Sequence, residues 1–246
     1  MALAKGVNCA ITKATFTIIL QRISLMAHST IRFFFDFISP YSYLAWKQIH
    51  ALAERTGMRI EPVPVLFAAF LNAYGQKGPA EIPPKRLYMF KELFRRAHRL
   101  DLPLVPPPSH PFLPLLSLRV ASLPMTDHDR KRLIDSLFAE AWGGGSGIES
   151  PENVTAVANR LGLDGHQLVR DAGLPASKDR LREQTEGALK TGVFGVPTMI
   201  VGQELFWGAD SLEDLEAYIR GDDPLQHAGM ELFARWQNML PSAKRH

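Results

Sequence analysis

The stretch D-F-I-S-P-Y-S-Y-L-A-W, residues 36–46, places Ser39 and Ser42 where a strand pattern gives way to a helix pattern. Redox enzymes of similar outline carry C-x-x-C at such a junction, and serines cannot form that disulfide. Ser39 followed by Pro40 is also a good helix start, because the hydroxyl accepts a backbone N–H and the fixed φ of proline suits the first turn. The junction is therefore either a plain helix cap or a site that uses a hydroxyl.

A second motif, G-V-F-G-V-P-T at residues 192–198, favours the site. Its Val196-Pro197 pair lies between a glycine and a short strand pattern, which is typical of a cis-proline loop beside a catalytic helix start. The alternative is an ordinary turn with a trans proline. The two motifs together predict one site from distant parts of the chain.

Other reactive side chains narrow the chemistry. The chain has one cysteine, Cys9, which excludes an intrachain disulfide and a cysteine-rich zinc site and fits a reducing compartment, so we expect a cytoplasmic protein. Its eight histidines show no metal-ligand spacing, and we expect no metal site.

The elements around Ser39 read as a βαβ unit. Residues 30–38, T-I-R-F-F-F-D-F-I, are typical of a buried strand. Residues 40–57 have helical spacing of apolar side chains and end at a glycine. Residues 58–67 alternate like a second strand, with two prolines that mark an edge or an end.

The rest of the chain completes an α/β fold. From about 68 to 191 helical patterns alternate with proline and glycine breaks, and two short strands and a helix then follow. This late ββα lacks the strands for its own core, so we expect an α/β thioredoxin-like core, βαβ…ββα, interrupted by an inserted α-helical subdomain. The expected segments are an N-terminal extension (1–27), the core (28–67 and 192–222), the α-helical insertion (68–191) and a C-terminal tail (223–246).

Charge argues against a nucleic-acid partner. The formal net charge is +3, and Lys5, Lys13 and Arg22 all lie in the start segment, so the balance is zero from Met26 onward. No basic run remains to bind phosphates. No stretch approaches the 18 apolar residues of a membrane span, and we expect no membrane partner.

Five segments in order resemble one known family. They are F-D-F-I-S-P-Y-S-Y-L-A-W, G-P-A-E-I-P-P-K-R-L-Y, H-P-F-L-P-L-L-S-L-R-V, V-F-G-V-P-T-M-I-V-G and F-W-G-A-D-S-L-E-D-L-E. Together, over about residues 31–220, they resemble the 2-hydroxychromene-2-carboxylate isomerases, relatives of the kappa-class glutathione transferases in the DsbA-like branch of the thioredoxin fold. The segment 142–153 departs from the family in being glycine-rich, which implies a different substrate pocket.

The resemblance implies a glutathione-dependent isomerase that converts 2-hydroxychromene-2-carboxylate into trans-o-hydroxybenzylidenepyruvate, a step in bacterial naphthalene breakdown. Ser39 would contact the sulfur of glutathione, so that the cofactor supplies the thiol that the chain lacks. The hydroxyl and the positive end of the first helix would lower the thiol pKa from its usual 8.5 or so. The thiolate would add to the conjugated substrate, and the ring would then open. Rotation about the former double bond and loss of the thiol would complete the reaction.

The resemblance also implies further contacts with glutathione. Val196, before Pro197, would pair its backbone with the cysteinyl part. The segment Trp207, Gly208, Ala209 and Asp210 would wrap the γ-glutamyl end, with Asp210 accepting from the ammonium group. Alternatively, Asp210 caps the last helix. Lys85 would reach the glycyl or the substrate carboxylate, or is simply solvated.

Two other functions stay open from the sequence. A kappa-like glutathione transferase or peroxidase would consume or oxidise glutathione, and a non-catalytic module would bind extended peptides in the cis-proline groove. We favour the isomerase, with a small aromatic substrate and glutathione as its partners. A homodimer is the ordinary expectation for such enzymes.

Overall fold

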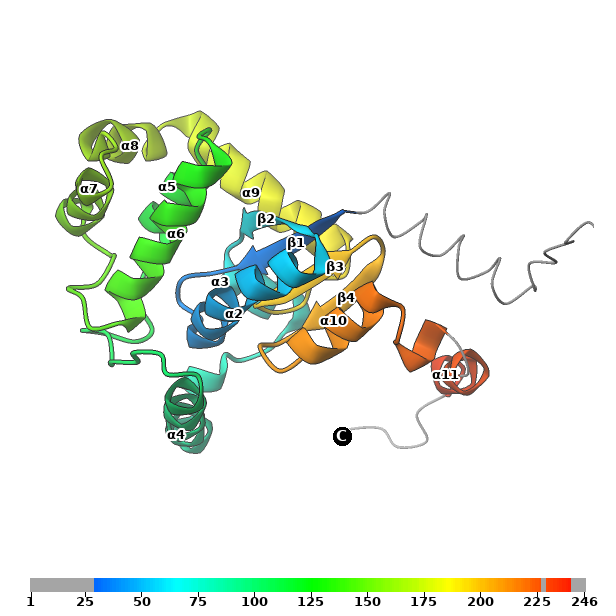
Figure 1. The fold of residues 1–246 in the computed structure, drawn as a ribbon. Helices are drawn as coiled ribbons and strands as arrows, with labels where there is room; N and C mark the ends of the chain where they lie inside the picture. The colour runs from blue at the N-terminus through cyan, green and yellow to red at the C-terminus, as the bar shows by residue number, and fades with distance from the viewer. Residues whose placement is uncertain (1–28, 227–228, 240–246) are drawn as a thin grey trace, which may run out of the picture.

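The centre of the computed structural model, which describes residues 29–226 and 229–239, is a four-stranded sheet of order β2-β1-β3-β4 (Figure 1). Its strands are β1 (Thr30–Phe35), β2 (Arg59–Pro64), β3 (Thr198–Val201) and β4 (Glu204–Trp207). β1 runs parallel to β2 and antiparallel to β3, and β3 runs antiparallel to β4. The first strand and the late hairpin thus form one sheet, as the predicted βαβ…ββα core requires.

Helices cover both faces of this sheet, and successive side chains of β1 point to the two faces in turn. Phe33 and Phe35 pack on the face covered by α2 (Pro40–Thr56) and α10 (Leu212–Arg220). Phe34 packs on the other face, with residues of α3 (Phe67–Tyr74) and α9 (Pro175–Lys190). Side chains of successive residues point to opposite faces of a strand, so this run of phenylalanines supplies both halves of the core.

A block of helices lies to one side of the sheet (Figure 1). Its members are α4 (Pro83–Arg99), α5 (Leu115–Ser122), α6 (Asp127–Trp142), α7 (Pro151–Arg160) and α8 (Gly165–Ala172). The short 3-10 helices Pro79–Glu81 and Pro224–Gln226 and the helix α11 (Met230–Gln237) complete the elements. Phe138 of α6 packs against Phe35 of β1, with ring centroids 5.6 Å apart, so block and sheet share one core.

The observed order of elements confirms the predicted fold class. The first strand is shorter than its apolar run, because the chain turns at Asp36 instead of continuing to residue 38. The extension 1–27, with Cys9, and part of the 223–246 tail lie outside the described residues. In the part of the chain that is described, no helix combines the length and apolar character needed to cross a membrane.

Candidate active site

Ser39 is the N-cap of α2, at the point where the chain leaves the sheet. Its Oγ accepts a hydrogen bond from the Ser42 N–H at 3.1 Å, and Pro40 occupies the first helical position. The predicted helix cap is therefore present. The first turn of α2 contains no acidic residue, so the positive end of its dipole remains available to an anion.

The loop before β3 reaches the same hydroxyl. The Val196–Pro197 peptide bond is cis, which confirms the sequence prediction. Ser39 Oγ donates to the Val196 carbonyl at 3.5 Å, across 157 positions of sequence. This distance is at the outer limit for such a bond, so the hydroxyl proton is free to turn toward a stronger acceptor. Ser39 is thus both a cap and a donor with a weak partner.

Three side chains that the sequence analysis missed hold the turn before Ser39. The Asp36 carboxylate accepts from the N–H of Ile38 at 3.1 Å and from that of Phe67 at 2.9 Å. Trp142 Nε1 donates to the Phe37 carbonyl at 2.8 Å, and His110 Nε2 lies 3.2 Å from the Ile38 carbonyl. The backbone direction into α2 is therefore fixed from three sides.

Burial shifts the pKa of two of these groups. Desolvation raises the pKa of Asp36 from 3.8 to about 7, against the two backbone hydrogen bonds that lower it. Burial also lowers the pKa of His110, the bond to Ile38 raises it, and the positive charge of Arg86 lowers it again. A carbonyl only accepts, so the neutral His110 carries its proton on Nε2.

The predicted γ-glutamyl segment lies beside the cis-proline loop. The Gly208 N–H donates to the Pro197 carbonyl at 2.9 Å. A Cβ on Gly195 would lie 2.7 Å from Trp207 Nε1, so the indole rests directly on that glycine. Phe194 packs on the same indole with ring centroids 5.1 Å apart. Trp207 is 54% exposed and Phe194 36%, which leaves an accessible aromatic surface next to Val196.

Asp210 does not cap α10, the helix that directly follows it. The N-cap of α10 is Ser211, and no side chain makes a capping hydrogen bond there. The exposed Asp210 carboxylate makes no hydrogen bond or ion pair with any described residue, and its charge acts on Tyr41 of the S-P-Y-S motif. Of the two sequence interpretations, the capping one is wrong, and the ligand one stays open.

Helix α4 also contacts the S-P-Y-S motif. Tyr41 Oη donates to Glu92 of α4 at 2.9 Å, and Glu92 also pairs with Arg96. Lys85, in the first turn of α4, is exposed, and nothing in the described part of the chain links it directly to Ser39, Val196 or Asp210. The predicted role of Lys85 therefore rests on its helix, not on an observed contact.

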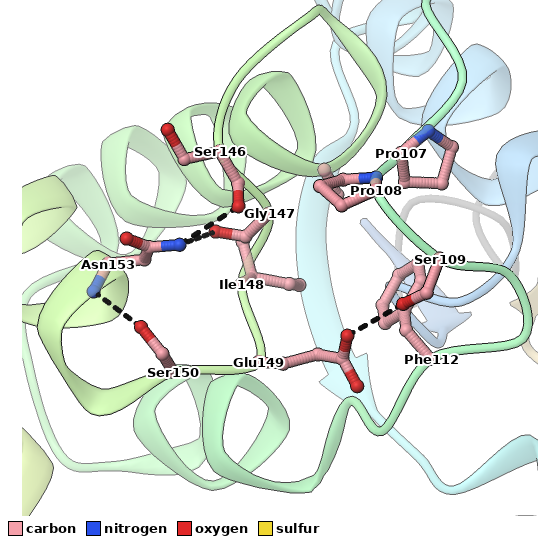
Figure 2. A pocket seen from close by; sticks show the side chains of 11 residues that line it. Pro107, Pro108, Ser109, Phe112, Ser146, Gly147, Ile148, Glu149, Ser150 and Asn153 are labelled. Carbon is pink, nitrogen blue, oxygen red and sulfur yellow. Dashed lines mark hydrogen bonds between the residues drawn. The ribbon is translucent and has the colours of Figure 1, made fainter.

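The glycine-rich segment and the proline-rich loop enclose a cavity of about 150 Å³ (Figure 2). Glu149 joins the two by accepting from Ser109 Oγ at 2.8 Å and from the Leu113 N–H at 2.9 Å. Phe112 lines this cavity and also packs against His110, with ring centroids 6.3 Å apart. His110 thus contacts both a residue that lines the cavity and the turn before Ser39.

The arrangement suits an extended thiol peptide. Ser39 offers a hydroxyl at a helix N-terminus, and the Val196 N–H has no acceptor among the described residues. Val196 is largely buried and directly precedes the cis-proline, and an unpaired backbone N–H is what an added strand satisfies. Asp210 offers a free carboxylate for a cation. No described cluster of histidine, cysteine or acidic side chains has the geometry of a metal site.

Comparisons with known proteins identify the relatives of this chain. The model of the DSBA-like thioredoxin domain family matches residues 30–220. The chain is 34% identical over 193 residues to 2-hydroxychromene-2-carboxylate isomerase of Sphingobium xenophagum, covering 77% of this chain and 97% of the relative. It is 26% identical over 230 residues to human glutathione S-transferase kappa 1, covering 87% and 95%.

A solved structure resembles this chain over most of its length. The structure of 2-hydroxychromene-2-carboxylate isomerase superimposes with a TM-score of 0.72 at 27% identity, and the match covers 87% of this chain and all of that chain. A probable DsbA oxidoreductase of Streptomyces coelicolor, 15% identical with a TM-score of 0.60, shares the fold.

Proposed function

The chain belongs to the 2-hydroxychromene-2-carboxylate isomerases of the DSBA-like thioredoxin domain family, and from this membership we propose that it is a glutathione-dependent isomerase. Its substrate would be 2-hydroxychromene-2-carboxylate or a close analogue, interconverted with trans-o-hydroxybenzylidenepyruvate in aromatic hydrocarbon catabolism. We further propose that it acts in the cytoplasm as a homodimer.

The observation that carries the proposal is the position of the Ser39 hydroxyl. It lies at the N-terminus of α2 and opposite the Val196 carbonyl, where a disulfide enzyme would hold a thiol. A hydroxyl cannot be the nucleophile of a disulfide exchange, but it can donate a hydrogen bond to a sulfur nucleophile. The site therefore fits a ligand that brings its own thiol, as glutathione does.

Glutathione, when bound, supplies a thiol whose thiolate adds to the conjugated substrate and is eliminated unchanged after rotation about the former double bond. Ser39 turns its proton from the Val196 carbonyl to the sulfur, which favours the thiolate. The Val196 backbone pairs with the cysteinyl part, and Asp210 accepts from the γ-glutamyl ammonium group. The aromatic side chain of Trp207 covers this end, and Lys85 reaches a carboxylate.

Replacing Ser39 tests the proposal. Ser39→Gly should lower glutathione-dependent turnover by about a hundredfold, as the loss of one donor to a reacting anion does. Glycine still caps a helix at a cost of only a few tenths of a kcal/mol, so the unfolding midpoint should change little. Both values follow from steady-state rates and urea denaturation.

Ser42→Ala is the matched control. The Ser42 hydroxyl is fully buried and makes no hydrogen bond within the described structure, so its loss should spare turnover. Equal turnover in Ser39→Gly and wild type would remove Ser39 from the chemistry.

A kappa-like transferase is the second candidate, because kappa transferases are relatives over most of this chain. It would consume glutathione, whereas the isomerase returns it. The higher identity to the isomerases, 34% against 26%, favours the isomerase.

A further inference from the structure

Two cations in the first turns of α4 lie on different sides of that helix. The buried side chains of α4 are Met89, Leu93 and Ala97. With 3.6 residues per turn, Met89 lies one turn after both Lys85 and Arg86, which are about 100° apart around the helix, and Phe90 lies one turn after Arg86 alone. Lys85 instead lies in a row with Glu92 and Arg96, two and three turns further along.

The contacts of α4 show what each side faces. The row of Glu92 meets Tyr41, on which the charge of Asp210 also acts, so Lys85 lies on the side predicted to bind glutathione. Phe90 packs against His110 with ring centroids 5.5 Å apart, so Arg86 lies on the side of His110. The charge of Arg86 acting on His110 agrees with this placement.

Arg86 is exposed, and its guanidinium makes no hydrogen bond or ion pair with any residue that the structure describes. His110, whose pKa the charge of Arg86 lowers, lies 3.2 Å from the carbonyl of Ile38, the residue before Ser39. The side of α4 that carries the unpaired Arg86 guanidinium thus contacts, through Phe90, the ring that holds the turn before Ser39. The rings of Phe90 and His110 supply an aromatic surface between them.

We propose that Arg86 binds the carboxylate of the aromatic substrate, leaving Lys85 to glutathione. The planar guanidinium fork matches a carboxylate in two parallel hydrogen bonds, which a lysine cannot provide. The bicyclic body of the substrate lies along Phe90 and His110, and its reacting carbon points to the sulfur held at Ser39. This assignment rests on the proposed isomerase function and adds the residue that selects an acidic substrate.

Binding of an unreactive analogue tests the assignment without turnover. The probes are chromone-2-carboxylate and the uncharged chromone-2-carboxamide, titrated in the presence of S-methylglutathione, whose capped sulfur cannot react. The wild type should bind the carboxylate about tenfold or more tightly than the carboxamide, as a hydrogen bond to a charged group contributes. Arg86→Gln should abolish this preference, and Arg86→Lys should restore only part of it.

Two variants on the same helix are the controls. Arg95→Gln removes an equal charge from an exposed position away from the buried side, and it should keep the preference. Lys85→Gln should weaken S-methylglutathione and keep the preference. The assignment is overturned if wild type shows no preference, if folded Arg86→Gln retains it, or if Lys85→Gln abolishes it instead.

Failure of the proposed function would be seen separately. A wild type that binds the carboxylate through Arg86 but does not isomerise 2-hydroxychromene-2-carboxylate would contradict the isomerase and keep the carboxylate site. If the wild type isomerises the substrate but Arg86→Gln keeps the preference for the carboxylate, the isomerase function stands and the carboxylate site at Arg86 is contradicted.

Discussion

Ser39 combines two tasks in one hydroxyl. Its lone pairs cap α2 through the Ser42 N–H, and its proton is held only by the 3.5 Å contact to Val196. The two tasks use different parts of the group, so a bound sulfur can take the proton without breaking the cap. The S-P-Y-S motif predicted the cap at Ser39, and the V-P-T motif predicted the cis-proline loop beside it. Both features depend on local backbone chemistry, which a short motif can indicate.

Asp210→Asn should separate ligand binding from helix stability. The carboxylate makes no capping hydrogen bond, so the unfolding free energy should stay within about 0.5 kcal/mol of wild type. Glutathione affinity should fall about tenfold or more through loss of a charged hydrogen bond. Calorimetric titration and urea denaturation measure the two quantities.

Asp214→Asn is the control for that experiment, since Asp214 is a nearby acid that lies within the first turn of α10. It should keep the glutathione affinity and lose a few tenths of a kcal/mol from the helix dipole. Lost stability with unchanged affinity in Asp210→Asn would contradict the ligand role.

Asp36 should make stability depend on pH. The pKa of Asp36 is about 7 in the folded state, against 3.8 for an aspartate that is not buried. Between these two pH values the folded state keeps a proton that the unfolded state has lost. Stability therefore falls as pH rises through this window, by up to about 1.4 kcal/mol per pH unit. Asp36→Asn should flatten the dependence, measured by urea denaturation at pH 5 and pH 8.

The exposed Asp222 provides the comparison for Asp36. Asp222→Asn should leave the difference between pH 5 and pH 8 as in wild type. Parallel pH profiles for Asp36→Asn and wild type would mean that burial does not raise the Asp36 pKa.

At the scale of elements, the turn between β1 and α2 depends on one helix and one loop that are distant in sequence. Trp142 comes from the end of α6 and His110 from the proline-rich loop, and each engages one carbonyl of the turn. Their partners are backbone atoms, which carry no residue identity, so no motif could predict them. Asp36 did leave a signal, an acid within an aromatic run, which indicates a buried carboxylate with backbone partners.

Removing either donor should lower turnover through the position of Ser39. His110→Phe and Trp142→Phe keep an aromatic ring but leave a carbonyl unpaired, at a cost of about 1–3 kcal/mol in stability. Turnover should fall about tenfold or more, because small displacements of a reacting group are costly. The double variant should lose less than the product of the two effects, since both donors hold one turn.

Tyr43→Phe controls for the lost hydrogen bond. Its hydroxyl donates at 2.7 Å to the Pro103 carbonyl, outside the turn. This variant should lose comparable stability and keep turnover. Equal turnover in all three variants would show that the turn needs no such support.

For the molecule as a whole, the order of elements was predictable because its signals are strong and periodic. The phenylalanine run of β1, the proline and glycine breaks, and the late ββα each point to the same α/β core. The site was predictable only where both partners lie in motifs, as with Ser39 and Val196. Two other features depend on how the helical block packs. One is the contact of Phe112, which lines the cavity of Figure 2, with His110. The other is which part of the molecule Lys85 and Arg86 each face.

The most direct test is the ultraviolet spectrum of 2-hydroxychromene-2-carboxylate mixed with the full protein, with and without a catalytic amount of glutathione, while total thiol is counted. We predict rapid conversion toward trans-o-hydroxybenzylidenepyruvate that requires glutathione and leaves the thiol count unchanged. An unchanged spectrum with glutathione bound, or a thiol count that falls with each turnover, would contradict the isomerase and direct attention to conjugation or peroxide reduction.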